Sequence, residues 1–291
     1  MQKIRHTPRA ATSIRELDTH QGIDPHRHDD HQICYAGSGV LSITTDAGTW
    51  VAPTTRALWI PAGTVHEHRA FGRADLHCVG LPVHLNPLSL TAPAVLAVGP
   101  LLRELILEYT RAPEDGSAQR RRMLGVLLDQ LKASPLQPLH LPAPADPRLA
   151  AVCALLHADP ADPRGLAELA AHAGAGAGER TLSRLFRSEL GMTFPQWRTQ
   201  LRLHHALRLL AVDTPVTAVA HRCGWSSASA FIDVFRRAFG HTPGAHAKGV
   251  GAGSGPPGSQ GGHREATMVE ETVPGPGAGR HPWLTPAHPK Y

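Results

Sequence analysis

The sequence lacks the features that mark membrane-spanning, secreted and disulfide-bonded proteins. No apolar run approaches the roughly 20 residues needed to cross a bilayer, and we find no secretory segment. The four cysteines show no paired spacing, so we expect free thiols in a reducing cytoplasm. They are Cys34, Cys78, Cys153 and Cys223.

An excess of positive charge is absent from most of the chain. Residues 1–90 hold 8 basic and 8 acidic side chains, residues 91–163 hold 7 and 8, and residues 249–291 hold 3 and 3. Residues 164–248 hold 11 Lys and Arg against 5 Asp and Glu. A basic excess confined to one segment indicates a partner with a phosphate backbone, because the summed charge of the segment attracts it.

The basic segment contains an internal repeat. The stretches GERTLSRLFRSELG and SSASAFIDVFRRAFG align without gaps at a constant offset of 49 residues. In each, apolar residues recur at i, i+3, i+4 and i+8 and a glycine follows, which predicts an amphipathic helix with a left-handed cap. The apolar positions are Leu182, Leu185, Phe186 and Leu190 in the first copy and Phe231, Val234, Phe235 and Phe239 in the second.

A short helix is predicted before each of these helices. GLAELAAHAG (165–174) and PVTAVAHRCG (215–224) also end on glycine. The unit is therefore short helix, glycine-containing turn and second helix, which is helix-turn-helix organisation, and it occurs twice. The alternative is an ordinary helical domain with a solvated basic face, and the localised charge favours DNA over that alternative.

This duplicated unit resembles the DNA-binding domain of AraC/XylS-type transcription regulators. The matching residues are LAELAAHAG, ERTLSRLFRSELGMTFPQWR, LRLHHALRLL and VTAVAHRCGWSSASAFIDVFRRAFGHTPG, from about Leu149 to Lys248. The resemblance implies a linking helix near residues 195–210 that holds two recognition helices against successive major grooves of double-stranded DNA. The first turn is longer than is usual in the family, and Gly178 occupies the capping position.

The resemblance assigns DNA-facing residues to both recognition helices. Arginine can bind guanine edges or phosphates, so the first helix is expected to read most bases and the second mainly to position the protein or contact thymine methyls. We expect DNA contacts from Arg180, Ser183, Arg184 and Arg187 in the first helix, and from Ser227, Ala228, Ser229, Ile232, Asp233 and Arg236 around the second.

The remainder of the chain predicts a multidomain α+β protein. Short β-rich runs between Gly and Pro turns predict an N-terminal antiparallel barrel or sandwich over residues 1–90, of which we favour the β-barrel. Apolar stripes predict a helical pair over 91–133. These stripes must be buried on the barrel or on a second copy, so we expect a homodimer. A Pro-rich linker (134–147), the all-α domain with two helix-turn-helix units (148–248; units 166–190 and 216–239) and a Gly- and Pro-rich disordered tail (249–291) complete the prediction.

Two motifs in the N-terminal third resemble the cupin motifs. The first is His26-x-His28 followed by Gln32, and the second is Pro61-x-Gly63 followed by His66. His26 and His28 share one face of a strand because side chains alternate along it. The resemblance implies one divalent transition metal held by His26, His28 and His66, with Gln32 as a weak fourth ligand. His31 and His68 are expected to surround the site or to be exposed, and the alternative is a polar pocket without metal.

Together these features predict an effector-responsive, sequence-specific DNA-binding regulator in the cytoplasm, without catalytic residues. The cupin-like domain would sense a small molecule or a metal. The rival interpretation is a cupin metalloenzyme, an isomerase or dioxygenase, with an accessory helical domain. A third is an interaction protein whose helices bind another protein. A duplicated helix-turn-helix with localised charge favours the regulator, because an enzyme needs neither feature.

Overall fold

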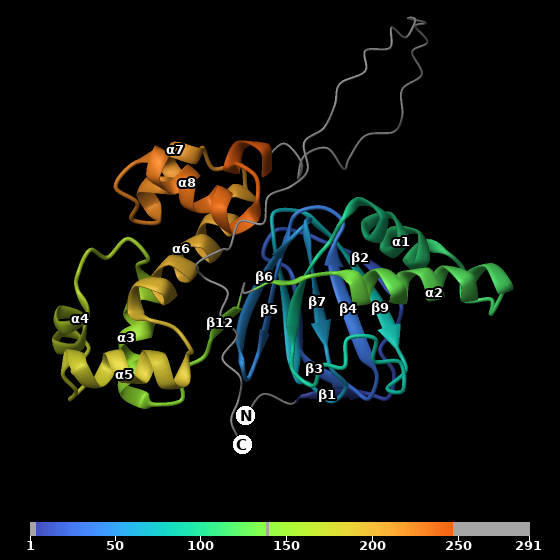
Figure 1. Cartoon of the computed structure of the whole chain (residues 1–291), viewed down its shortest axis with the longest axis horizontal. Helices are drawn as coiled ribbons and strands as arrows, with labels where there is room; N and C mark the ends of the chain where they lie inside the picture. Colours follow the sequence, from blue (N-terminus) through green and yellow to red (C-terminus); the bar gives the residue numbers. More distant parts are fainter. Residues whose placement is uncertain (1–3, 138–139, 247–291) are drawn as a thin grey trace, which may run out of the picture. The chain divides into compact units, whose positions relative to one another are not determined.

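The computed structural model describes residues 4–137 and 140–246 (Figure 1). The predicted disordered tail, residues 249–291, lies outside the described residues. Within them, strands occupy the N-terminal part and helices the C-terminal part, as the α+β prediction requires.

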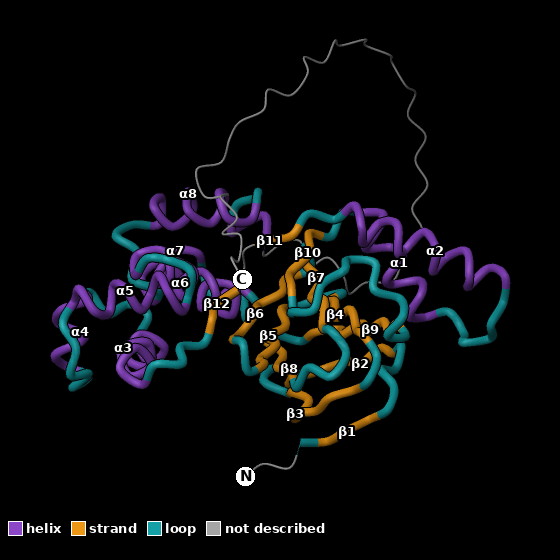
Figure 2. Tube along the Cα trace, turned by 60° about the horizontal axis from the view of Figure 1, so that its bottom comes forward, coloured by secondary structure: helices purple, strands orange, loops and turns teal. Residues whose placement is uncertain are grey.

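The described strands form two six-stranded sheets, sheet A and sheet B (Figure 2). Sheet A has the order β1-β3-β8-β5-β6-β12 and sheet B the order β11-β10-β7-β4-β9-β2. Sheet A consists of β1 (Arg5–Thr7), β3 (Gly22–His28), β8 (His66–Phe71), β5 (Val40–Thr45), β6 (Gly48–Pro53) and β12 (His140–Pro142). Sheet B consists of β11 (Leu136–Gln137), β10 (Ala94–Ala97), β7 (Arg56–Ile60), β4 (His31–Ala36), β9 (Ala74–Leu81) and β2 (Ser13–Leu17).

The predicted antiparallel barrel is wrong in two respects, and the alternative of a sandwich fits the described strands. The described strands form two separate ladders with edges, and β1 pairs with β3 in parallel. One corner illustrates the reason: β6 ends at Pro53, which has no N–H for a further ladder bond, and β7 then joins the other sheet. The sheets face each other across one apolar core containing Leu41, Ile43, Leu58 and Ile60.

The segment predicted as a linker supplies an edge strand to each sheet. Leu136 pairs with Leu96 in sheet B, and His140 pairs with Trp50 in sheet A. The imidazole of His140 also stacks on the Trp50 indole at 4.5 Å. Residues in this segment therefore belong to the N-terminal sheets as well as to the connection.

Helices α1 (Pro100–Arg111) and α2 (Ala118–Ala133) cover the outer face of sheet B. Leu102, Ile106, Leu127 and Leu131 are fully or almost fully buried there, against a group that includes Ile33, Tyr35, Trp59 and Val79. Because both faces of the sheet are covered, β4 and β7 are buried along their whole length. The apolar stripes were predicted to be buried on the strands or on a second copy of the chain, and in the structure they pack on sheet B.

The C-terminal part is all-helical over the described residues. Its helices are α3 (Pro147–Ala158), α4 (Leu166–His172), α5 (Glu179–Glu189), α6 (Phe194–Leu210), α7 (Val216–Arg222) and α8 (Ala228–Phe239). The predicted linking helix is α6, which starts with a capping box between Thr193 and Gln196. No helix in the described ranges combines the length and apolarity that a membrane crossing demands.

Helix α6 contributes to two separate apolar clusters. Trp197 and Leu201 from its first half pack with α3, α4 and α5. Leu203, Leu207 and Leu210 from its second half pack with α7 and α8, in a cluster that continues into the core of the two sheets. This single helix therefore holds both helix pairs by burial of apolar surface.

Candidate DNA-binding surface and histidine cluster

The pairs α4/α5 and α7/α8 have the same backbone construction. Gly174 and Gly224 follow the first helix of each pair with φ of 59° and 73°. The N–H of the next residue then bonds back to the helix, from Ala175 to Ala170 and from Trp225 to Ala220. These are the hydrogen bonds of a glycine helix terminus, and they set the turn between the two helices.

The two turns differ in length and in the cap that follows. Residues 173–178 connect α4 to α5, whereas residues 223–227 connect α7 to α8, so the first turn is one residue longer. Gly178 begins α5 without a side-chain cap, as the sequence predicts. Ser227 begins α8, and its hydroxyl accepts a hydrogen bond from the Ala230 N–H at 3.1 Å.

The apolar positions predicted for α5 and α8 are confirmed. Leu182 and Phe186 are fully buried in the first pair, and Phe231 and Phe235 are fully buried in the second. The opposite faces of the two helices are therefore the ones available to a partner.

The outer face of α5 is a hollow lined by basic and hydroxyl side chains. Three of the predicted DNA contacts, Arg180, Arg184 and Arg187, are exposed there, and Ser183 is half-buried between them. None of these arginines forms an ion pair with any residue that the structure describes. Their guanidinium groups are thus available for phosphate or base oxygens, which guanidinium binds well.

The outer face of α8 is nearly neutral. Arg236 donates to Asp233 on the same helix at 3.0 Å, and both side chains are more than half exposed. Ser229 is exposed, while Ala228 and Ile232 are half-buried. An exposed ion pair at this spacing contributes little to stability, but Asp233 neutralises the charge of Arg236, the only cationic side chain on this helix that is predicted to contact DNA.

The second candidate site is a group of four histidines on two neighbouring strands of sheet A. His26 and His28 lie on β3, and His66 and His68 lie on β8. All four are buried, and His26 is directly opposite His66 in the strand pairing. A register shift between Ile23 and His26 precedes this pair, which re-aims the side chains.

The four imidazole rings lie close together. The ring centroids of His26 and His66 are 4.3 Å apart, those of His28 and His66 are 5.0 Å apart, and those of His66 and His68 are 5.1 Å apart. One ring nitrogen from each of His26, His66 and His68 lies within 4.8 Å of the others.

Hydrogen bonds orient three of the rings. Nδ1–H of His26 donates to the Asp24 carbonyl, Nδ1–H of His28 to Asp30, and Nδ1–H of His66 to Thr64, at 2.7–2.9 Å. Nε2 of His28, Nε2 of His66 and Nδ1 of His68 are buried without a hydrogen-bond partner. Backbone carbonyls that fix one nitrogen and leave the other as an electron-pair donor are typical of metal-binding histidines.

Burial keeps His26, His66 and His68 in the neutral form that binds metal. It lowers the pKa of His26, lowers that of His66 to about 3 and that of His68 far below its usual range. Their neighbours' positive charge adds to the shift. Neutral imidazole nitrogens carry the lone pair that a transition metal requires.

Three other residues were considered for this site, and the structure places only His68 among them in the cluster. Gln32 lies on β4 in sheet B, and its Oε1 accepts a hydrogen bond from the Cys34 thiol at 3.2 Å. Both ring nitrogens of His31 are bonded, to the Ala62 N–H and the Val83 carbonyl. His68, expected outside the site, is inside it. The His66-x-His68 spacing, identical to that of His26-x-His28, was the signal for this.

Comparison with known proteins assigns both parts of the chain. A model described as a helix-turn-helix domain matches residues 169–249. A model described as an AraC-like ligand binding domain matches residues 13–193, more than half of the chain. The chain belongs to the AraC family of transcription regulators. In this AraC-family protein an N-terminal ligand-binding domain accompanies a helix-turn-helix DNA-binding domain.

Curated and solved proteins are similar to all or part of this chain. The chain is 34% identical over 226 residues to the HTH-type transcriptional regulator NimR of Escherichia coli K12, covering 76% of this chain and 81% of NimR. ToxT from Vibrio cholerae, solved with an unsaturated fatty acid, shares 12% identity over 81% of this chain and 93% of its own, with a TM-score of 0.35. The DNA-binding domain of AdpA, solved with target DNA, shares 36% identity over 35% of this chain and 90% of its own, with a TM-score of 0.33.

Proposed function

We propose that this AraC-family regulator reads its operator mainly through α5. The observation that carries the proposal is the set of three exposed arginines, Arg180, Arg184 and Arg187, in one hollow without ion pairs to described residues. Arg184 lies at the centre of the exposed face of α5, the helix expected to enter the major groove. Bidentate contacts from such an arginine to guanine discriminate bases.

The α8 helix positions the protein more than it reads sequence. Its outer face offers small groups, including Ser227, Ala228 and Ser229, and one arginine that Asp233 already compensates. Small apolar groups contact thymine methyls, and hydroxyls and main-chain N–H groups hold phosphates. Both contacts fix the register of the protein on the duplex.

Salt-dependent binding tests this assignment. The full-length protein should bind random duplex DNA and heparin at low salt, and the affinity should fall as salt rises because bound cations are released from the phosphates. A binding site selected from a random duplex pool then provides the specific ligand. Failure to bind either polyanion at low salt would contradict the DNA-reading assignment.

We further propose that the N-terminal domain responds to one divalent transition metal. The four-histidine cluster fits such an ion because three buried ring nitrogens have no hydrogen-bond partner and three rings are oriented by carbonyls. Imidazole donors suit zinc, nickel, copper and cobalt. His26, His28, His66 and His68 form the proposed ligand set, in which His68 takes the role expected for Gln32.

The duplicated helix-turn-helix and the exposed arginines of α5 favour a regulator over the cupin-enzyme alternative, because an enzyme needs neither feature. We therefore propose that the protein has no catalytic role and acts on DNA in the cytoplasm.

Elemental analysis tests the metal proposal without relying on regulation. Protein purified without a histidine tag should hold about one transition-metal ion per chain, and His68→Ala and the His26→Ala, His28→Ala double variant should lose it. Gln32→Ala is the matched control and should keep the metal. If the double variant keeps the metal, or if the wild-type protein holds none, the metal proposal is wrong and the histidines only line a polar pocket.

We also propose that the regulator is a homodimer through α1 and α2. Leu101 on α1 is 54% exposed and Val126 on α2 is 44% exposed, beside the apolar residues that the sheet covers. Sedimentation of the full-length protein should show dimers at micromolar concentration. Monomers alone at that concentration would limit the role of these helices to covering sheet B.

A further inference from the structure

Strand β8 presents different chemistry on its two faces. His66 and His68 point into the sandwich, whereas Glu67 and Arg69 point outward from sheet A. This alternation follows from the two-residue period of a strand. Strand β8 therefore carries two histidines of the cluster on its inner face and two charged residues on the outer face of sheet A.

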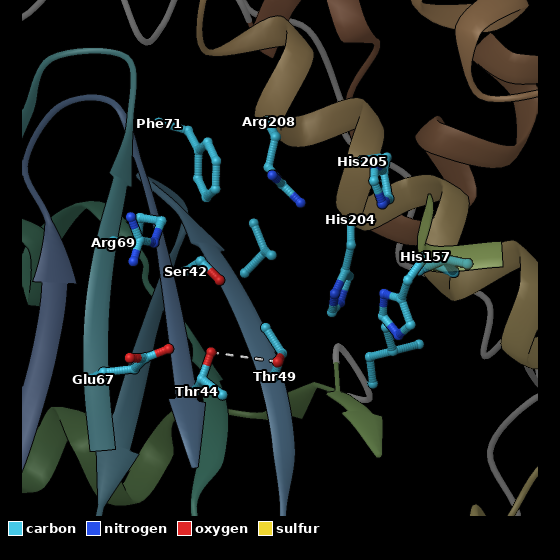
Figure 3. A pocket seen from close by; sticks show the side chains of 13 residues that line it. Ser42, Thr44, Thr49, Glu67, Arg69, Phe71, His157, His204, His205 and Arg208 are labelled. Atoms are coloured by element: carbon cyan, nitrogen blue, oxygen red, sulfur yellow. Dashed lines mark hydrogen bonds between the residues drawn. The ribbon is translucent and has the colours of Figure 1, made fainter. Parts of the chain in front are cut away.

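A cavity of about 260 Å³ lies on this outer face (Figure 3). Strands β5, β6 and β8 line one side, and α6 lines the other. Above the cavity, sheet and helix meet closely: a Cβ at Gly72, just after β8, would lie 2.2 Å from the Ala211 carbonyl oxygen. The space is thus a recess between packed elements of the described chain.

Two arginines face this recess from opposite sides. The Arg208 guanidinium reaches from α6 toward the strands and lies over the Phe71 ring at 4.1 Å (Figure 3). Arg69 on β8 donates to the His20 carbonyl at 3.4 Å. Neither arginine, nor Glu67, forms an ion pair with another described residue. Burial, with the charge of Arg69 adding to it, lowers the pKa of Arg208.

The rest of the lining is mixed, with hydroxyl and carboxylate groups beside apolar surface from Val51, Leu141 and Leu201. Ser42, Thr44 and Thr49 turn their hydroxyls to the cavity, and the Thr44 and Thr49 oxygens are 3.5 Å apart. Glu67 adds a carboxylate acceptor. Two arginines and one glutamate leave the lining with an excess of one positive charge before the histidines contribute, which a monoanion would compensate.

We propose that this recess is a second ligand site, which binds a small hydroxylated monocarboxylate such as a sugar acid. Arg69 and Arg208 hold the carboxylate, because an anion between them replaces their mutual repulsion with charge-assisted hydrogen bonds. The hydroxyls of β5 and β6 and the carboxylate of Glu67 pair with the ligand's hydroxyl groups. An analogue that lacks either feature leaves these partners without their hydrogen bonds, which gives the site its selectivity.

The site lies where a ligand affects DNA binding most directly, and this consequence rests on the proposed function. Helix α6 packs against both helix pairs. A ligand that contacts both sheet A and α6 therefore favours one orientation of the helix pairs over others. Because β8 also carries His66 and His68, metal and carboxylate share one structural element. Their affinities should be reciprocally linked.

Titration calorimetry of the full-length protein with D-gluconate tests the site. Saturable binding is expected at millimolar or lower concentration. Sorbitol has the hydroxyls without the carboxylate, and hexanoate has the carboxylate without the hydroxyls, so each should bind at least tenfold more weakly. Arg69→Gln removes one exposed guanidinium and should weaken gluconate binding at least tenfold, whereas Arg73→Gln, an exposed arginine outside the recess, should not change it.

Three outcomes would overturn the proposal. These are no gluconate binding, equal binding by Arg69→Gln, and binding of hexanoate or sorbitol as tight as that of gluconate. Binding of random duplex DNA by the same samples reports on α5 independently. Absence of gluconate binding by the wild-type protein, with its salt-dependent DNA binding intact, therefore contradicts this inference and leaves the proposed function standing.

Discussion

The two helix pairs share a backbone but differ in surface and in core. Both turns follow a glycine with positive φ and the same pattern of backbone hydrogen bonds. Yet α5 presents Arg180, Arg184 and Arg187 without ion pairs to described residues, whereas α8 pairs its Arg236 with Asp233. The repeated fold therefore fixes where a helix is held, and the exposed side chains decide what it does there.

The cores separate the pairs in a second way. The first pair packs with α3 and the start of α6 in its own cluster, to which the sheets contribute Leu141 of β12. The second pair belongs to a cluster that continues through the end of α6 into the sandwich. Effects that start in the ligand-binding domain should therefore reach α7 and α8 before α4 and α5.

Truncation of matched core phenylalanines should give the largest effects and should sharpen this difference. Phe186→Ala and Phe235→Ala remove equivalent, fully buried rings, and each should cost about 3–5 kcal/mol of local or global stability. Hydrogen exchange should show Phe186→Ala loosening α3, α4, α5 and the start of α6 but not the sheets, and Phe235→Ala loosening α7 and α8 together with β5 and β8. Equal patterns in the two variants would contradict the separation of the cores.

Loss of metal should be the next largest effect. The His26→Ala, His28→Ala variant should bind the metal at least 100-fold more weakly, equal to about 2.7 kcal/mol. In the wild-type protein, metal should slow hydrogen exchange in β3 and β8 and, less strongly, in α7 and α8. Exchange in α4 and α5 should not change. Slowing confined to α4 and α5 would reverse the proposed route of coupling.

Acid should weaken the second pair before the first. Burial lowers the pKa of His246 to about 4, with the charges of His241 and Arg56 adding to the shift, and its ring lies 5.7 Å from that of Phe235. The unfolded state takes up a proton near pH 6.5, so the stability that neutral His246 provides is complete above that pH and is lost as the pH falls toward 4.

Hydrogen exchange at pH 7 and pH 5 measures this difference directly, after correction for the intrinsic pH dependence of exchange. Protection of α8 should fall more than that of α5. His246→Leu should remove most of the pH dependence from α8, because the leucine has no proton to take up. An unchanged pH dependence in His246→Leu would assign the acid sensitivity to other groups.

Release of Arg236 should give the smallest effect. Asp233→Asn keeps the shape of the side chain and frees the guanidinium, so binding to random duplex DNA should tighten a few-fold and the salt slope should steepen by about one ion. Specificity should not improve. A gain in sequence discrimination would show that α8 reads bases as α5 does.

The repeat, the charge segregation and the buried helical faces were predictable because each depends on local periodicity. Leu182, Phe186, Phe231 and Phe235 are buried as the spacing requires. Long-range pairing was less predictable, because sequence patterns do not specify which strand joins which sheet. The barrel was therefore preferred over the sandwich that the strands form, and the strands of the linker were not predicted.

The histidine cluster shows the same limit. The His26-x-His28 spacing predicted one shared face, but the partner strand decides what completes the group. The pairing of β3 with β8 places His68 in the cluster, whereas Gln32 lies in the other sheet. Local patterns identified the chemistry of the site, and tertiary pairing selected its members.

Helix α5 should read sequence through Arg184, and this can be measured by comparing the wild-type protein with Arg184→Ala and Arg184→Lys. For each protein the affinity for a selected site is divided by the affinity for random duplex. Lysine keeps the charge but not the bidentate fork. We expect the ratio to fall in both variants by an amount equal to about 1–3 kcal/mol, and one position of the site to become degenerate. Equal weakening on all sequences in Arg184→Ala, with full rescue by Arg184→Lys, would make Arg184 a phosphate contact and contradict the claim.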